Sequence, residues 1–297
     1  MKLATFDHGG RRQVGIVSTD GKSVQPLGLP VQAGAGGVLA LVTGAAAGVA
    51  SVQPVGPAIL IGDVVLQAPI PAPRRNIFCV GRNYHEHAKE LSGSVFKNSS
   101  ANTAAWPIVF TKVPESVVGP GQLVQLPGSV SSQIDYEAEL AVVIGRGGRN
   151  ISRAAAMSHV YGYTIVNDVT ARDVQMRHQQ WDLGKSFDTF CPMGPWLVTA
   201  DELDGQNTRV RCWVNGELRQ DARTTDLIFD IPTLIETCSR GITLLPGDII
   251  ATGTPSGVGM GMKPPVFLQP GDTVRIEIEG IGILENAFVA QDGQQPS

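Results

Sequence analysis

The clearest pattern in the chain is a regular alternation of side chains between residues 134 and 144. Successive side chains on a β-strand point to opposite faces. The even positions all suit a buried face, and they are Ile134, Tyr136, Ala138, Leu140, Val142 and Ile144. The odd positions place Asp135, Glu137 and Glu139 together on the other face. The pattern therefore predicts one strand with a core face and a row of acids.

The other hydrophobic runs are short and are separated by turn residues, which predicts a β-rich α+β fold. Further strands are expected near Phe6 and at residues 14–17, 64–66, 77–80, 108–110, 162–166, 210–214, 248–252 and 273–279. Asp20-Gly21 and Asn215-Gly216 are typical hairpin turns. Helices are expected at 85–91, from an N-cap at Ser152 to about Val160, and from Pro232 to Gly241.

A proline-rich connector, Ala68 to Pro73, predicts a domain boundary near residue 70. We expect a small N-terminal α/β domain at 1–70, a catalytic domain at 71–290 and a loose tail at 291–297. Residues 31–52 carry almost no charge but are rich in Ala and Gly, which contribute little transfer free energy. They predict a small packed helix with loops rather than a membrane span.

The composition narrows the class of protein. Of the 297 residues, 42% are apolar, which is enough for a large core, and 17% are charged. A soluble domain has roughly 25% charged residues, so the low fraction predicts a covered surface and an oligomer. The net charge is −4 without a basic run, which argues against nucleic acid and anionic membrane as partners. The four cysteines lack metal or redox spacing and no signal-peptide core follows Met1, so we expect a cytoplasmic protein.

The acidic face of residues 135–139 suggests a metal site. Carboxylates two positions apart on a strand repel each other, and glutamate is a poor strand former, so a compensating cation is expected. Asp168 follows the apolar run 163–166 and supplies a third acid at a strand end. An all-oxygen set suits Mg²⁺ or Mn²⁺. The alternatives are a solvated outer face for the glutamates and a simple turn role for Asp168.

His87 and Glu90 are three residues apart and share a face if residues 85–91 are helical. A carboxylate can orient an imidazole and raise its basicity, as a general base requires. The alternative is ordinary charge decoration of an exposed helix. A second reading pairs His85 with His87 on a strand as ligands of iron or zinc. The polar run from Glu86 to Glu90 favours the helix.

Two further segments carry candidate ligand-binding groups. Lys185 precedes an apolar segment, and a lysine beside a metal can balance carboxylates or neutralise a developing enolate. The alternative is a surface lysine. The Gly253–Gly259 loop lacks the helix that follows a true phosphate cradle. We expect a tight loop that offers Thr254 and backbone N–H groups to a ligand.

From Ile77 to Ala287 the chain resembles the fumarylacetoacetate hydrolase family. The matching motifs are Gly81-Arg82-Asn83-Tyr84 with His87 and Glu90, Asp135 to Leu140, Asn167 to Asp173, Gly184 to Pro192, and Gly247-Asp248 with Thr252 to Pro255. The resemblance implies a mixed β-sandwich or roll and a homodimer. The first metal-binding aspartate of the animal tyrosine-pathway enzyme has no match near Val80 to Tyr84, so the chain resembles the shorter, three-carboxylate branch.

The resemblance also implies roles for single residues. The implied metal ligands are Glu137, Glu139 and Asp168; the implied water-activating pair is His87 with Glu90; and the implied ligand-contacting positions are Lys185, Gln175, Thr254 and Arg82. We expect substrate side-chain specificity to lie in residues 92–106 and 177–181.

These roles predict hydrolysis of an acylpyruvate to pyruvate and a carboxylic acid. The 1-carboxylate and 2-oxo group would chelate the metal, which stabilises the enolate that leaves. His87 would activate the water that attacks the 4-oxo carbon, while Lys185 spreads the charge. Oxaloacetate decarboxylation and isomerisation of a hydroxymuconate-type diacid stay open as alternatives. A non-catalytic binder would be expected to lack one of these residues, and none is missing.

Overall fold

The computed structural model describes residues 1–44, 52–91, 106–177 and 180–291. A large sheet of twelve strands dominates it. Its strand order is β4 (Ile59–Leu60), β3 (Ser23–Pro26), β2 (Arg11–Val17), β1 (Lys2–His8), β14 (Cys191–Thr199), β12 (Val160–Asn167), β11 (Ala138–Ile144), β17 (Ile249–Ala251), β6 (Ile77–Gly81) and β7 (Ile108–Lys112). Off this path, β5 (Val65–Gln67) pairs with β1, and β8 (Val117–Val118) with β14.

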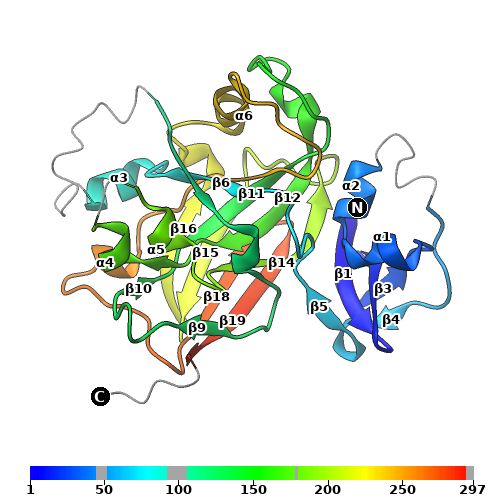
Figure 1. Cartoon of the computed structure of the whole chain (residues 1–297), viewed down its shortest axis with the longest axis horizontal. Helices are drawn as coiled ribbons and strands as arrows, with labels where there is room; N and C mark the ends of the chain where they lie inside the picture. The colour runs from blue at the N-terminus through cyan, green and yellow to red at the C-terminus, as the bar shows by residue number, and fades with distance from the viewer. Residues whose placement is uncertain (45–51, 92–105, 178–179, 292–297) are drawn as a thin grey trace.

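A second, five-stranded sheet covers part of the large one (Figure 1). Its order is β16 (Glu217–Arg223), β15 (Arg209–Val214), β18 (Thr273–Ile278), β19 (Gly282–Ala290) and β9 (Val124–Leu126). A two-stranded sheet joins β10 (Ile134–Asp135) to β13 (Thr170–Ala171). The helices are short: α1 (Val31–Ala35), α2 (Leu39–Thr43), α3 (His85–Leu91), α4 (Arg172–Gln175), α5 (Asp182–Lys185) and α6 (Ile231–Ser239). The β-rich α+β class expected from the sequence is confirmed.

The large sheet has a hydrophobic core on each face. The even positions of residues 134–144 pack between the two sheets, against residues such as Val210 and Ile276 of the five-stranded sheet. On the opposite face, Ala141 and Val143 pack with Leu41 and Ile77. Because β11 is central in the sheet, both of its faces are buried, and its side chains are held firmly.

Two sequence-based expectations need correction. Residues 134–144 form two strands rather than one, and Tyr136 and Glu137 between them belong to neither. The reason is that β10 pairs with β13 while β11 pairs with β12. The helix expected from Ser152 is only a 3₁₀ turn, η5 (Ala156–His159). The chain joins β12 at Val160, which leaves too few residues for a stable α-helix.

The N-terminal strands, drawn in blue in Figure 1, lie at one side of the molecule and join the large sheet through β1 and β14. The domain division at residue 70 stays a prediction. In the stretch 31–52, where one small packed helix with loops was expected, the structure has two short helices, α1 and α2, and residues 45–51 lie outside the described part. Among the described residues, no helix is long and apolar enough to cross a membrane.

Candidate active site

Three buried carboxylates meet where β11 begins and β12 ends. The antiparallel pairing of β11 with β12 places Ala138 opposite Asn167, so Glu137 and Glu139 lie beside Asp168. One carboxylate oxygen from each acid lies within 4.8 Å of the others. These three residues are at most 5% exposed, so the reading of a solvated outer face is wrong.

Two buried lysines contact this acidic triad. Lys185 Nζ donates to Glu137 Oε2 at 2.8 Å and to Asp168 Oδ2 at 2.7 Å. Lys112 Nζ donates to Asp168 Oδ1 at 2.8 Å and also bonds the backbone carbonyl of Lys185. Neither lysine is exposed, which excludes the reading of Lys185 as a surface residue. The repulsion among the acids is therefore relieved in part by the chain itself.

Arg172, in α4, is a third buried cation. Its Nη1 lies 2.7 Å from Glu137 Oε1, and its Nε donates to Asp135 Oδ2 at 2.9 Å. Asp135 also accepts backbone N–H bonds from Gly259 and Met260, so it anchors Arg172 and a loop rather than joining the triad. The buried Nη2 of Arg172 has no hydrogen-bond partner among the described residues, which leaves a donor for a ligand.

The charge balance differs between the two glutamates. Burial raises the pKa of Glu137, but Lys185 and Arg172 outweigh it and lower this pKa to about 2. Burial, and then Asp168 and Glu137, raise the pKa of Glu139 well above its ordinary value. The charge of Lys185 and a hydrogen bond from the Gly253 N–H, at 2.9 Å, offset this only in part. Glu139 is thus the least compensated acid, and a dication beside it would keep it ionised.

The donor set fits a divalent metal. It consists of carboxylate oxygens only, which suits Mg²⁺ or Mn²⁺ better than zinc. Each oxygen that a cation already contacts keeps a second lone pair for a metal. The acidic triad is therefore suited to a hard dication, although the oxygen ligands do not distinguish the two metals.

His87 and Glu90 lie on one face of α3, as the spacing predicted. His87 Nδ1 is 3.0 Å from Glu90 Oε2, and Glu90 Oε1 accepts the N–H of Gly257 at 3.0 Å. His87 is buried at 2% exposure, whereas His85 is exposed on the same helix. The alternative of a metal-binding histidine pair on a strand is therefore wrong.

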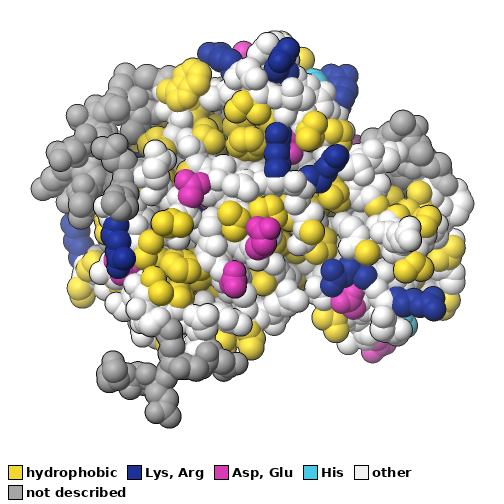
Figure 2. Space-filling view, viewed as in Figure 1, with side chains coloured by type: hydrophobic (Ala, Val, Ile, Leu, Met, Phe, Trp, Pro, Cys, Tyr) yellow, Lys and Arg dark blue, Asp and Glu magenta, His cyan; other side chains and the backbone are white. Residues whose placement is uncertain are grey.

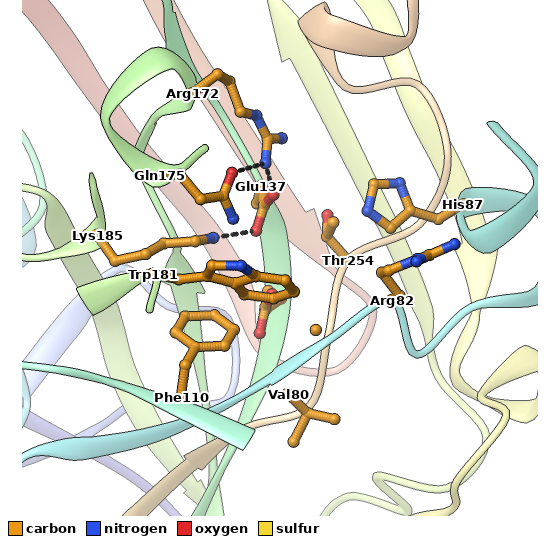
Figure 3. A pocket seen from close by; sticks show the side chains of 12 residues that line it. Val80, Arg82, His87, Phe110, Glu137, Arg172, Gln175, Trp181, Lys185 and Thr254 are labelled. Atoms are coloured by element: carbon orange, nitrogen blue, oxygen red, sulfur yellow. Dashed lines mark hydrogen bonds and ion pairs between the residues drawn. The ribbon is translucent and has the colours of Figure 1, made fainter. Parts of the chain in front are cut away.

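A small pocket of about 20 Å³ brings these groups together. Its lining residues are Val80, Gly81, Arg82, His87, Phe110, Glu137, Glu139, Arg172, Gln175, Trp181, Lys185 and Thr254. Figure 3 shows Lys185 and Gln175 on one side and His87 on the other, with Thr254 between them. Phe110 and Trp181, with ring centroids 5.3 Å apart, form an aromatic wall below. Seven of the nine residues predicted for the site line this pocket. The other two, Glu90 and Asp168, contact His87 and Lys185, which line it.

The remaining predicted ligand contacts differ in detail. Gln175 Oε1 accepts from Arg172 Nη1 at 3.2 Å, which leaves its amide N–H groups for a ligand. Arg82 has a left-handed φ of 56° between β6 and α3, and its Nη2 is 3.4 Å from the Ala88 carbonyl. The loop after β17 does present Thr254. However, the N–H groups of Gly253 and Gly257 bond Glu139 and Glu90, so the expectation that these backbone groups face a ligand needs correction.

Sequence reasoning missed three polar residues that shape the site: Arg172, Lys112 and Gln220. Arg172 lies four residues after Asp168, inside the Asn167–Asp173 motif, and its nearness to a predicted metal ligand was a signal that could have found it. Lys112 and Gln220 are isolated polar residues on strands and carry no comparable local signal. Of the segments predicted to set specificity, residues 92–105 and 178–179 lie outside the described part of the chain.

Known proteins resemble this chain in sequence and in structure. The family described as fumarylacetoacetate (FAA) hydrolase C-terminal matches residues 76–289. The oxaloacetate tautomerase YisK of Bacillus subtilis is 53% identical over 227 residues, which are 76% of this chain and 73% of that protein.

Two solved structures resemble the whole chain. A fumarylacetoacetate hydrolase from Exiguobacterium antarcticum is 39% identical, covers 98% of this chain and all of its own, and has a TM-score of 0.83. A 2-hydroxyhepta-2,4-diene-1,7-dioate isomerase from Mycobacterium marinum is 35% identical, covers 99% of this chain and all of its own, and has a TM-score of 0.77.

Proposed function

The chain belongs to the fumarylacetoacetate hydrolase family, and we propose that it is a divalent-metal-dependent enzyme that interconverts the keto and enol forms of a small 2-oxo diacid such as oxaloacetate. One observation carries the proposal. Two glutamates of an acidic triad suited to Mg²⁺ or Mn²⁺ and a buried histidine held by a carboxylate line the same small pocket. A relative that is 53% identical is named an oxaloacetate tautomerase, which supports oxaloacetate as the substrate.

The residues of the pocket divide the chemistry between them. A bound dication would act as a Lewis acid toward the oxygens of a 2-oxo acid. Lys185 carries a charge, because Asp168 and Glu137 raise its pKa despite burial, and it donates hydrogen bonds toward the developing enolate oxygen. The free donors of Gln175 and Arg172 Nη2 are available to substrate oxygens.

His87 is the proposed proton carrier. Its Nδ1 faces Glu90, so its Nε2 is the atom left to take the proton from C3 of the keto form. Glu90 holds the ring and stabilises the imidazolium that results. The imidazolium then returns the proton to the oxygen on C2, which gives the enol, or to C3, which restores the ketone.

Acylpyruvate hydrolysis, the main prediction from the sequence, remains the second candidate. The His87–Glu90 pair favours it, because the same Nε2 can take a proton from water instead of from carbon. The comparisons support the isomerase-type alternative better, since the named relatives include an oxaloacetate tautomerase and a dioate isomerase. Oxaloacetate decarboxylation needs only enolate stabilisation and is assayed beside both.

Three assays on the Mn²⁺- or Mg²⁺-loaded protein separate these reactions. The absorbance of enol-oxaloacetate follows tautomerisation, pyruvate release follows decarboxylation, and loss of acetylpyruvate follows hydrolysis. We expect kcat/KM for tautomerisation to exceed the other two by about tenfold or more, a difference near 1.4 kcal/mol in barrier. Faster cleavage of acetylpyruvate would replace the tautomerase proposal with the hydrolase.

Replacement of His87 tests the proton carrier. We predict that His87→Ala lowers turnover by about two to four powers of ten, as for a lost general base, while Mn²⁺ affinity survives. His85→Ala is the matched control, because His85 is exposed on the same helix, and it should retain full activity. Unchanged turnover in His87→Ala would remove this residue from the mechanism.

We also propose a homodimer and a cytoplasmic location. The low charged fraction of 17% supports a partly covered surface. On the face drawn in Figure 2, apolar side chains gather in patches while Lys and Arg are scattered, with no basic stripe to attract nucleic acid. Sedimentation equilibrium of the full chain would measure the assembly.

A further inference from the structure

One buried amide side chain of the five-stranded sheet lies beside the candidate active site. Gln220, in β16, is 0% exposed. Its Oε1 accepts the N–H of Ala138 at 3.0 Å, between the two glutamates of the acidic triad. Its Nε2 donates to Thr254 Oγ1 and to the Pro255 carbonyl, each at 2.8 Å. One side chain therefore joins the carboxylate strand to the pocket loop.

The orientation of this amide is fixed by its partners. A backbone N–H such as that of Ala138 only donates, and a carbonyl such as that of Pro255 only accepts. The reversed amide would set N–H against N–H and oxygen against oxygen at these two contacts. Gln220 Nε2 must therefore face Thr254 Oγ1, which accepts its hydrogen bond.

This contact determines the direction of the Thr254 hydroxyl proton. Since Thr254 Oγ1 accepts from Gln220, its own proton points elsewhere, and no acceptor for it is found among the described residues. Thr254 is 2% exposed and lines the pocket between Lys185 and His87 (Figure 3). The hydroxyl is thus left as a donor toward a ligand oxygen.

We propose that Gln220 is a positioning residue that fixes Thr254 as a hydrogen-bond donor to a carboxylate or oxo oxygen of the substrate. The inference rests on the proposed function, because it assumes that a 2-oxo acid occupies this pocket. Gln220 touches no reacting atom and acts through Thr254.

The backbone around Gln220 supports the same role. Gly257, three residues after Thr254, has a φ of +103°, and a Cβ there would lie 1.9 Å from the Arg219 carbonyl oxygen. The loop therefore packs directly on β16. The Gly257 N–H donates to Glu90, the partner of His87. The loop that packs on β16 therefore holds both Thr254 and Glu90 in place.

A double-mutant cycle with oxalate tests the inference. Gln220→Met keeps the length but removes the hydrogen bonds, and Thr254→Val removes the hydroxyl. Calorimetry would measure the Kd of oxalate at saturating Mn²⁺. We expect each single variant to weaken oxalate binding about tenfold, as for a lost hydrogen bond to a charged group. The double variant should bind no more weakly than Thr254→Val, and Mn²⁺ affinity without oxalate should stay unchanged.

Two control variants separate positioning from general damage. Thr254→Ser keeps the hydroxyl and should bind oxalate like the wild type. Asn286→Leu removes another buried amide from the same sheet, one that donates to the Gly119 and Gln122 carbonyls and does not line the pocket. It should lower stability and leave the oxalate Kd unchanged. If Gln220→Met does not fold, Gln220→Leu serves instead, because it also removes the donor to Thr254.

Several outcomes would overturn the inference. An unchanged oxalate Kd in both Gln220 variants would remove the positioning role. Losses that multiply in the double variant would show that Gln220 acts by a route other than Thr254. A wild-type protein that binds Mn²⁺ but no oxalate would contradict the proposed function as well, so the two failures are distinguishable.

Discussion

Glu137 and Glu139 are two residues apart, yet the charges around them differ. Lys185 and Arg172 outweigh the burial of Glu137, whereas burial, Asp168 and Glu137 outweigh the effect of Lys185 and the Gly253 N–H on Glu139. In the metal-free protein, Glu137 is therefore part of a compensated ion cluster. Glu139 is the acid that most needs a bound dication.

This difference predicts opposite effects of two similar substitutions. Glu137→Gln leaves Lys185 and Arg172 short of a buried counter-charge, and we expect it to lower the free energy of unfolding in EDTA by about 3 kcal/mol. Glu139→Gln removes repulsion, keeps an acceptor for Gly253, and should leave that free energy unchanged or raised. Denaturant unfolding with EDTA measures both. Equal losses in the two variants would contradict the charge assignment.

A second residue-scale prediction concerns Lys112, whose buried Nζ contacts Asp168 and the backbone carbonyls of Val169 and Lys185. Lys112→Met removes all three bonds and leaves buried acceptors without a donor. We expect a loss of about 3 kcal/mol in the free energy of unfolding, as when one partner of a buried pair is removed. Lys89→Met on the exposed face of α3 is the control and should change stability little. Thermal and denaturant unfolding would show the contrast.

At the scale of elements, the features that depend on a local sequence pattern were predicted correctly. The even residues of 134–144 pack in the core between the sheets as the alternation indicated. The hairpin at Asn215-Gly216 and the helix beginning near Pro232 are also present as expected. Each of these features depends on neighbours within a few residues, which a sequence displays directly.

The features that the sequence did not predict depend on contacts with residues far away along the chain. The break at Tyr136 and Glu137 arises because β10 finds a different partner strand from β11. Gln220 reaches the site only through pairing in another sheet, 82 residues along the chain from Ala138. A polar residue on a strand gives no sign of such a contact, so its role appears only in the folded chain.

The longest helix among the described residues gives a pH-dependent prediction at this scale. Asp230 caps α6, and its Oδ1 accepts from the Thr233 N–H at 3.0 Å and from the Thr233 hydroxyl at 2.6 Å. Burial raises the Asp230 pKa, but these bonds and Arg153 outweigh it, so this pKa is lowered in the folded state. The carboxylate then stabilises the fold above its unfolded pKa of about 4, and the contribution is lost as pH falls below that value.

We therefore expect Asp230→Ala to lower the free energy of unfolding by about 1 kcal/mol at pH 7. The difference from wild type should shrink as pH falls below about 4 and passes through the lowered pKa of the folded carboxylate. Chemical unfolding at several pH values would measure it. A difference that stays constant over this range would assign the effect to lost packing rather than to the charged cap.

At the scale of the whole molecule, the site lies at the ends of two central strands of the large sheet, and the site ends of both strands are buried. Cores on both faces of β11 hold Glu137 and Glu139 close to Asp168, and the fold supplies only part of the balancing positive charge. The stability of the whole chain should therefore depend on a dication. This linkage can be measured without any substrate.

We predict that Mn²⁺ or Mg²⁺ raises the unfolding temperature of the EDTA-treated protein. An ion that binds only the folded state at about 100 times its Kd adds roughly 2.7 kcal/mol, which in a chain of this size corresponds to a shift of about 4 °C. Glu139→Gln is the matched control, because it folds with the same neighbours but lacks the charge that most needs the ion. It should unfold at the same temperature with and without metal. A wild-type chain indifferent to both ions, or a Glu139→Gln variant that responds as strongly, would mean that the three acids do not act together as a metal site, because the buried cations alone would then balance them.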